Sequence, residues 1–358
     1  MKKGSILSFS VVALFIAMAA MFLVSCNNSP NNDVDNKKGT AKSLSRANGG
    51  GIEDVDSLES DIRAANRETS QQGSGPKTVK IGSKEFKDSK KKAILIGVGN
   101  YEYPESEGGW ASIGSCNDVD MLTRKLNKAG FAVTPLKDAD ASLAGIKKTL
   151  DKALKDCHEG DQVLIHFSGH GQQIKSEKSL GEDDELTEAF VAYNAKKVYS
   201  KGNYQGEGHF TDDMLHDYVN KFSSKLGDSG FLMVTVDACH SESSTRGGNG
   251  NAITRGESQP FDWPDYTPKR SKVKGKRYIE LSACKDYKLN YEYYDKKDEK
   301  SYGSLSYLLG MALDKGLTDF VAITDYVMDK NNYKITMKRD GQKPCAGPVE
   351  YWGKKWPS

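Results

Sequence analysis

The sequence predicts an α/β protein in which a mostly parallel central sheet is covered by helices on both faces. Several short runs are apolar without interruption, as in strands that are buried on both faces of a parallel sheet. Segments with apolar residues at helical spacing separate these runs. Strands and helices therefore alternate from Lys91 onwards, and this order implies right-handed crossover connections.

Each expected element has its own signal. The run AILIGVG is short, apolar and ends in glycine, as a buried strand does. Val119, Leu122 and Leu126 lie on one helical face, and Gly130 follows as a helix stop. In chain order, we expect strands at 93–99, 131–136, 162–169, 231–238 and 277–283 and helices at 117–129, 142–155, 211–222 and 304–313.

Composition limits the class of protein. The chain has 358 residues, enough for a substantial core, but a hydrophobic fraction of only 37% indicates that part of it is unpacked. The net charge is +2, from 51 basic and 49 acidic residues, so the chain has no strong overall field. This balance argues against nucleic acid as a partner.

The N-terminal residues predict export. Lys2 and Lys3 precede an apolar run at 6–24, and Leu23-Val24-Ser25-Cys26 resembles a bacterial lipobox. The resemblance implies a signal peptide at 1–25 and a lipidated Cys26, which would anchor the protein to a membrane on the periplasmic or cell-surface side. An uncleaved membrane anchor is the alternative. The polar composition of 26–90 predicts a flexible tether, which leaves 91–358 as the folded domain.

Two expected strands end in reactive residues. HFSGHG places His170 just past the third strand, and VTVDACHS places Cys239 just past the fourth. In parallel sheets catalytic groups collect at the carboxyl ends of strands, so adjacent strands would bring the imidazole and thiol together. A buried structural Cys239 is the alternative. A zinc site lacks the usual ligand spacing.

The motifs HFSGHGQQ and DACHS resemble the caspase-like cysteine peptidases of the metacaspase and paracaspase branch, peptidase C14 type. The resemblance extends through AILIGVGNY, SIGSCNDVDML, YIELSACKDYKLNYE and GQKPCAGP, in the family's order, over residues 91–351. It implies a caspase-like α/β/α sandwich that hydrolyses peptide bonds, with Cys239 as nucleophile and His170 as general acid/base. The backbone N–H groups of Gly171 and Cys239 would form the oxyanion hole. No third member is evident, and the adjacent His240 should point away.

The same resemblance implies a substrate pocket for a basic residue. Asp118 and Ser168 match pocket positions, and Asp237 lies two residues before Cys239, on the same face of the strand. Two carboxylates would select Arg or Lys before the cut. A cation should also compensate Asp237. Alternatively, Asp118 acts only as an acidic residue at a helix N-terminus.

Three features remain open. Calcium activation has weak candidate ligands in an acidic loop that could equally be solvated: Glu182, Asp183, Asp184 and Glu185. No cofactor is needed for the chemistry itself. Glu242 replaces the family's usual Gly and has no assigned role. The remaining cysteines could pair outside the cell: Cys116, Cys157, Cys284 and Cys345.

A long polar stretch at 242–276 is rich in basic residues, among them Arg255 and Lys269. Stretches of this length are often functional or disordered. These residues could be self-cleavage sites or could plug the acidic pocket until cut; a mobile insertion is the alternative.

Three functions remain. The first is a monomeric endopeptidase that cleaves polypeptides after Arg or Lys. The second is a catalytically inactive relative that binds peptides, and the third is a structural surface lipoprotein. The intact pair of His170 and Cys239 favours the first.

Overall fold

The computed structural model describes residues 90–176, 186–239, 253–269, 277–283, 290–336 and 345–347. The signal peptide, Cys26, the tether, the four candidate calcium ligands, His240 and Glu242 lie outside this part. Within it, no helix combines the length and the apolar character that a membrane span requires.

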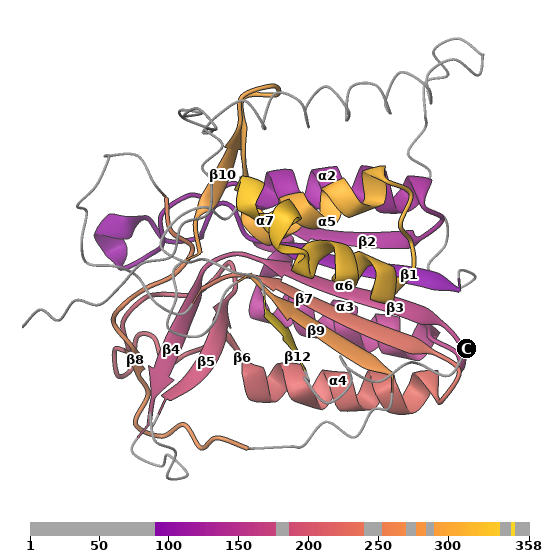
Figure 1. Cartoon of the computed structure of the whole chain (residues 1–358). Coiled ribbons are helices and arrows are strands. Elements are labelled where there is room, and N and C mark those ends of the chain that lie inside the picture. Colours follow the sequence, from indigo (N-terminus) through magenta and orange to yellow (C-terminus); the bar gives the residue numbers. More distant parts are fainter. Residues whose placement is uncertain are drawn as a thin grey trace, which may run out of the picture. The chain divides into compact units, whose positions relative to one another are not determined.

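A six-stranded sheet forms the centre of the domain, in the order β12-β9-β7-β3-β1-β2 (Figure 1). All neighbouring strands are parallel except β12 and β9, which are antiparallel. The strands are β1 Lys91–Gly97, β2 Ala132–Lys137, β3 Gln162–Ser168, β7 Phe231–Asp237, β9 Tyr278–Ser282 and β12 Cys345–Gly347.

Helices cover both faces of this sheet, which confirms the predicted fold class (Figure 1). One face carries α2 Ser115–Lys128, α5 Ser304–Asp314, α6 Phe320–Met328 and α7 Lys330–Thr336. The other carries α3 Leu143–Asp156 and α4 Asp212–Leu226. Short 3-10 turns occupy Glu105–Glu107 and Asp138–Ala141. The expected strands and helices are all present, and their ends differ from the expected ones by a few residues.

The sequence patterns did not reveal several short strands. A four-stranded sheet has the order β6-β5-β4-β8, and β10 pairs with β11 in a hairpin. These strands are β4 Gly171–Lys175, β5 Leu186–Val191, β6 His209–Thr211, β8 Phe261–Asp262, β10 Glu292–Asp295 and β11 Lys300–Gly303. They are too short, or too polar, to show a clear alternation.

Part of the polar stretch at 242–276 is built into the domain. β8 pairs with β4, and the side chains of Arg255 and Phe261 are completely buried. The alternative of a mobile insertion is therefore wrong for residues 253–269.

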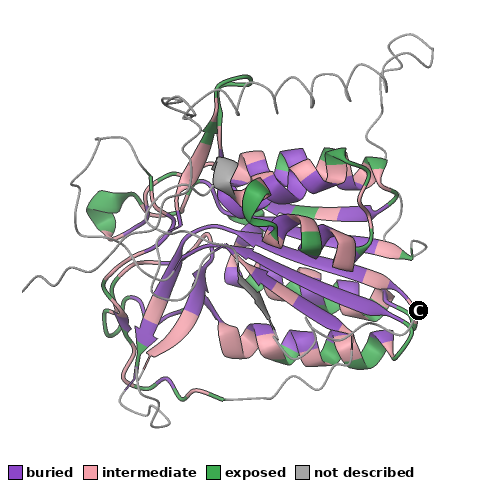
Figure 2. Ribbon diagram, viewed as in Figure 1, coloured by how far each residue is buried: buried purple, intermediate pink, exposed green. Residues whose placement is uncertain are grey.

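The core has one layer on each side of the central sheet (Figure 2). All seven residues of β7 are buried, as expected for a central parallel strand. Side-chain caps fix the starts of the helices beneath the sheet: Ser142 accepts a hydrogen bond from the Gly145 N–H, and Thr211 accepts one from the Met214 N–H. The strand ends are thus held by packed elements on both faces.

A buried ion pair lies at the opposite edge of the sheet from the carboxyl ends. The Lys92 ammonium on β1 is fully buried and pairs with Asp161, just before β3. It also donates to the Asp156 carbonyl at 2.9 Å, and the Asp161 carboxylate accepts from the His158 N–H at 2.8 Å. Removing one charge would leave the other buried without compensation.

We predict that Lys92→Met lowers the free energy of unfolding by about 3 kcal/mol, because Asp161 stays buried without its cation. The neighbouring Lys91→Met should cost less than about 1 kcal/mol, because Lys91 is only partly buried and its ammonium donates to the Thr318 hydroxyl. Urea denaturation of both variants measures the difference. Equal midpoints would contradict a structural role for the pair.

Candidate active site

The ends of β3 and β7 place His170 and Cys239 at one edge of the sheet. The two strands are adjacent and parallel, and Ser168 is paired with Asp237. His170 and Cys239 each lie two residues beyond this pair. The Gly169 N–H donates to the Asp237 carbonyl at 3.3 Å, which joins the two segments just past the strands. Both residues are buried.

A backbone carbonyl fixes the orientation of the His170 ring. Nε2 of His170 donates to the Ala111 carbonyl oxygen at 3.0 Å, so Nδ1 carries the lone pair. Nδ1 is buried and has no hydrogen-bond partner among the described residues. Burial lowers the pKa of His170 to about 3, so the imidazole is neutral at physiological pH and can accept a proton.

Aromatic side chains surround this imidazole. The Trp110 and Tyr101 rings lie 5.1 and 5.5 Å from it between centroids, and the Tyr101 hydroxyl accepts a hydrogen bond from the His170 N–H at 3.0 Å. They keep water away from one side of the ring, which accounts for its low pKa.

The side chain of Arg255 occupies the space beside these residues. Nη1 lies 3.0 Å from a carboxylate oxygen of Asp118 and donates to the Ser168 hydroxyl at 2.7 Å. Nη2 donates to Glu292 at 2.9 Å. Asp237 is farther away, with Oδ1 at 3.9 Å from Nη1. We call Asp118, Ser168, Asp237 and Glu292 the arginine site.

The three carboxylates of the arginine site are buried and are held by other contacts as well. Asp118 accepts from the Gly303 N–H at 2.9 Å, and Glu292 accepts from the Gly114 N–H at 2.6 Å. Burial raises the pKa of Asp118 to about 7, although the Arg255 cation acts in the opposite direction. Burial would lower the pKa of Arg255, but the carboxylates, Asp118 first, raise it above its ordinary value.

Asp237 is compensated mainly by neutral donors. Its Oδ2 accepts from the backbone N–H and the hydroxyl of Ser306, at 2.6 and 2.7 Å, and its Oδ1 accepts from the Asn290 amide at 2.8 Å. Arg255 supplies the cation that the sequence led us to expect, but more weakly than it does for Asp118. Asp118 itself lies in the first turn of α2, so its two interpretations are compatible.

The backbone of Arg255 is held at the strand ends as well. Its carbonyl oxygen accepts hydrogen bonds from the Cys239 N–H at 2.9 Å and from the Gly171 N–H at 3.2 Å. Two N–H groups thus converge on one carbonyl oxygen next to a thiol, which is the geometry that stabilises an oxyanion.

Sequence reasoning missed two contributors to this site. Glu292 lies in the run YEYYD, which has no apolar pattern. The group that orients the His170 ring is the backbone carbonyl of Ala111, an atom that no residue type encodes. The cue for Glu292 was weak: it is a carboxylate a short distance after the fifth expected strand.

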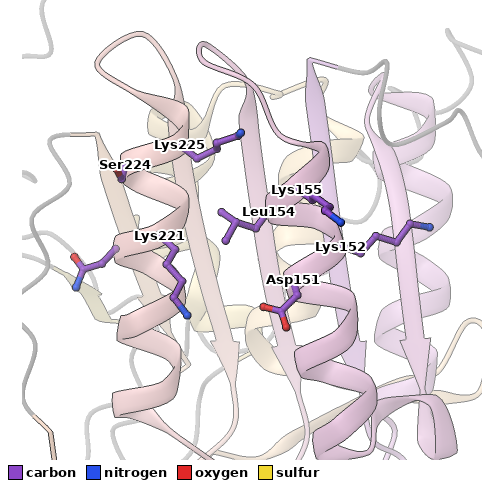
Figure 3. Close-up of a pocket in the computed structure, with 8 residues that line it drawn as sticks. Asp151, Lys152, Leu154, Lys155, Lys221, Ser224 and Lys225 are labelled. Carbon is purple, nitrogen blue, oxygen red and sulfur yellow. The ribbon is translucent and has the colours of Figure 1, made fainter.

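Potential metal ligands, free thiols and a surface cavity are the other features that could carry a function. Among the described residues, no group of three or more His, Cys, Asp or Glu side chains could hold a metal ion. Cys116 and Cys157 carry free thiols, and burial raises the pKa of each to about 12. A surface cavity of about 920 Å³ lies between α3 and α4; half of its eight lining residues are lysines, and none is a Cys or His (Figure 3).

A family model and curated proteins match this chain. A family model described as a caspase domain matches residues 90–346. Metacaspase-2 of Trypanosoma brucei brucei is 27% identical over 164 residues, which are 42% of each chain. Metacaspase-4 of Arabidopsis thaliana is 29% identical over 161 residues, 42% of this chain and 33% of the relative. The match therefore spans less than half the length of these curated relatives.

Two solved structures are also similar. A protein from Geobacter sulfurreducens aligns with 75% of this chain and 98% of its own, at 21% identity and a TM-score of 0.49. Caspase-1 from Spodoptera frugiperda aligns with 72% of this chain and 88% of its own, at 13% identity and a TM-score of 0.44.

We predict that Ser306→Ala lowers the free energy of unfolding by about 2 kcal/mol, because the Asp237 carboxylate loses a hydroxyl donor in a buried position. Ser304→Ala, on the same turn of α5, removes a bond to the uncharged Tyr291 carbonyl and should cost about half as much. Chemical denaturation compares the two. A Ser306→Ala variant as stable as the parent would contradict this account of Asp237.

Proposed function

The chain belongs to the caspase-domain family of cysteine peptidases, and on that premise we propose that it is an endopeptidase that cuts after arginine and, less readily, after lysine. The observation that carries the proposal is the position of Arg255. An arginine side chain fills a buried acidic site, while the carbonyl of the same residue faces the backbone N–H groups of Gly171 and Cys239. An arginine of a substrate would fit in the same way.

The proposed chemistry uses a dyad. Neutral His170 takes the thiol proton of Cys239, and the thiolate attacks the substrate carbonyl carbon. The N–H groups of Gly171 and Cys239 stabilise the oxyanion. His170 then protonates the leaving amine and later deprotonates the water that hydrolyses the thioester. The Ala111 carbonyl keeps Nε2 protonated, so Nδ1 remains the base throughout.

Preference for arginine follows from the two separate acids on the guanidinium. Asp118 lies at one terminal nitrogen and Glu292 accepts from the other, at 3.0 and 2.9 Å. A planar guanidinium can engage both carboxylates at once, whereas a lysine ammonium is a single point charge. Asp237 and Ser168 complete the site.

Calcium activation and lipid anchoring stay part of the proposal. Glu182 to Glu185 are the candidate calcium ligands, and Cys26 is the candidate lipid attachment site on an exported protein. Assays with calcium and with a chelator, and mass spectrometry of the membrane fraction, test these two points.

Fluorogenic peptides test the function directly. We expect cleavage after Arg, weaker cleavage after Lys and none after Asp, because the acidic site would repel a carboxylate. Cys239→Ala should be inactive on all of them. No cleavage of any peptide by the wild type, with or without calcium, would contradict the proposed enzyme.

Glu292→Gln should lower kcat/KM for an Arg peptide by about 10–100-fold, because one guanidinium nitrogen loses its charged partner. The Lys peptide should lose less, so discrimination between the two falls. Asp314→Asn is the matched control, since this exposed carboxylate on α5 pairs with Lys125 outside the arginine site. Equal losses for both peptides would contradict the assigned role of Glu292.

The raised pKa of Asp118 predicts a pH dependence. Below a pKa of about 7 its carboxylate is protonated and no longer attracts a guanidinium, so kcat/KM for an Arg peptide should fall as the pH drops through 7. Alkylation of Cys239 by uncharged iodoacetamide does not need the arginine site and should lack this inflection. The same inflection in both profiles would assign it to the thiol and imidazole instead.

A further inference from the structure

A buried histidine lies behind the candidate active site and takes no part in the proposed chemistry. Resting on the proposed function, we propose that His166 is a positioning residue for arginine specificity. It orients the Ser306 hydroxyl, and through that hydroxyl it holds the Asp237 carboxylate of the arginine site in place. A chain of hydrogen bonds, the burial of its members and the direction of its protons support this role.

His166 lies next to the arginine site on one face of the central sheet. In the register of β3 with β7, His166 is opposite Thr235, and Ser168 is opposite Asp237 two residues farther along. Residues two apart on a strand share a face, so these four side chains point to the same side of the sheet. This is the side that α5 covers, and Ser306 of α5 contacts both His166 and Asp237 there (Figure 1).

Four side chains form one continuous chain of hydrogen bonds. Nδ1 of His166 lies 2.8 Å from the Thr235 hydroxyl oxygen, and its Nε2 lies 3.2 Å from the Ser306 hydroxyl oxygen. The Ser306 hydroxyl donates to Oδ2 of Asp237 at 2.7 Å. All four residues are completely buried, so the chain connects the interior of the domain to the arginine site away from water.

The carboxylate determines the direction of the protons. Asp237 accepts the Ser306 hydroxyl proton, so the Ser306 oxygen is left as an acceptor for His166. Burial lowers the pKa of His166 to about 4, so the ring is neutral at pH 7 and carries one proton. That proton lies on Nε2, and Nδ1 accepts from the Thr235 hydroxyl. This arrangement gives both ring nitrogens and both hydroxyl protons a partner.

The same arrangement secures the contacts of Asp237. Because the Ser306 oxygen accepts from Nε2, the hydroxyl keeps its own proton for the carboxylate; a lone pair at Nε2 would draw that proton away. Oδ2 thus holds the hydroxyl and the N–H of Ser306, and Oδ1 holds the Asn290 amide. Donors on both oxygens fix the plane of the carboxylate. A planar guanidinium depends on that plane more than a lysine ammonium does.

Asn290 connects Asp237 to the backbone of the arginine. Its amide donates to Oδ1 of Asp237 at 2.8 Å, and its carbonyl accepts from the Arg255 N–H at 3.0 Å. Farther along the same edge, the Glu292 N–H donates to the Ile253 carbonyl at 3.1 Å. The position of Asp237 therefore affects the arginine at its side chain and, through Asn290, at its backbone.

Stability alone does not require a histidine at this position. Replacing both partners of a buried hydrogen bond by apolar side chains of the same shape is often nearly neutral for folding. An apolar pair at positions 166 and 235 would therefore fill the same space at little cost. The pair of His166 and Thr235 adds a fixed donor aimed at Ser306, which an apolar pair cannot supply.

Peptide kinetics of the full chain test the proposal. His166→Leu and His166→Phe both remove the donor to Ser306 and differ from each other in shape. Each should lower the ratio of kcat/KM for an Arg peptide to that for a Lys peptide by about 3–10-fold, the usual effect of one hydrogen bond. Arg255 competes equally with both peptides, so the ratio reports the site itself. The kcat for the Arg peptide should stay near the parent value, because Cys239 and His170 are unchanged.

Two further variants are controls. His166→Gln should keep the parent ratio, because a Gln amide offers both a donor for Ser306 and an acceptor. His209→Leu is the matched control: His209 is also completely buried, but its ring is bonded to Tyr204 and Gln172, outside the arginine site. Any loss of activity in His209→Leu should be equal for the two peptides.

Nitrogen NMR of the wild-type chain locates the ring proton without any need for activity. The chain has six histidines, and His166→Gln identifies the resonances of His166 by their loss. We expect the proton on Nε2. A proton on Nδ1 would overturn the proposal, whether or not the chain cuts peptides.

The kinetic outcomes separate this proposal from the proposed function. An active wild type would overturn the role of His166 alone if both donor-free variants keep the parent ratio, or if His166→Gln loses as much as they do. Should one donor-free variant fail to fold, the other supplies the measurement. A wild type that cleaves no peptide would overturn the proposed function and, with it, the role of His166 in specificity.

Discussion

The attraction between one guanidinium and three buried carboxylates organises the candidate active site. Asp118 comes from a helix, Asp237 from the end of a central strand and Glu292 from a hairpin, while Arg255 comes from the stretch between β7 and β9. Without a cation, three acids in such a small dry volume would repel one another and would lose part of their charge. The site is therefore stable only when a cation occupies it, and the chain supplies one of its own. In the proposed function, binding a substrate would exchange Arg255 for an arginine of the substrate.

The parallel sheet fixes the positions of the groups that take part in this exchange. Pairing of Ser168 with Asp237 fixes the relative height of β3 and β7, and both reactive residues follow at the same distance beyond that pair. Helices pack on both faces of the sheet, so the strand ends cannot slide. The Ala111 carbonyl and the two ring neighbours then hold the imidazole neutral and oriented. Position is determined by packed backbone, and the polar side chains contribute charge and selectivity.

Sequence patterns were informative where a local rule decides the structure. Continuous apolar runs and helical spacing predicted the five main strands and four of the helices, and the strand-end motifs singled out His170 and Cys239. Sequence patterns were uninformative where contacts between distant segments determine the structure. Arg255 was one of many basic residues in a polar stretch, and nothing nearby in the sequence shows that its side chain is fully buried. Glu292 lies in a hairpin too polar to alternate, and the carbonyl of Ala111 has no residue signature. The pairing of these groups depends on segments that are far apart in the chain.

For the proposed endopeptidase, the edge formed by residues 290–292 would also limit which proteins can be digested. It pairs with main-chain groups two residues apart, so it accepts a segment only when that segment is extended and has no other backbone partners. An arginine within a helix or a central strand of a folded target has those groups already occupied. Linkers, termini and loops do not have these backbone groups occupied. The proposed enzyme would therefore carry out limited proteolysis, in which folded domains are separated from one another and remain intact.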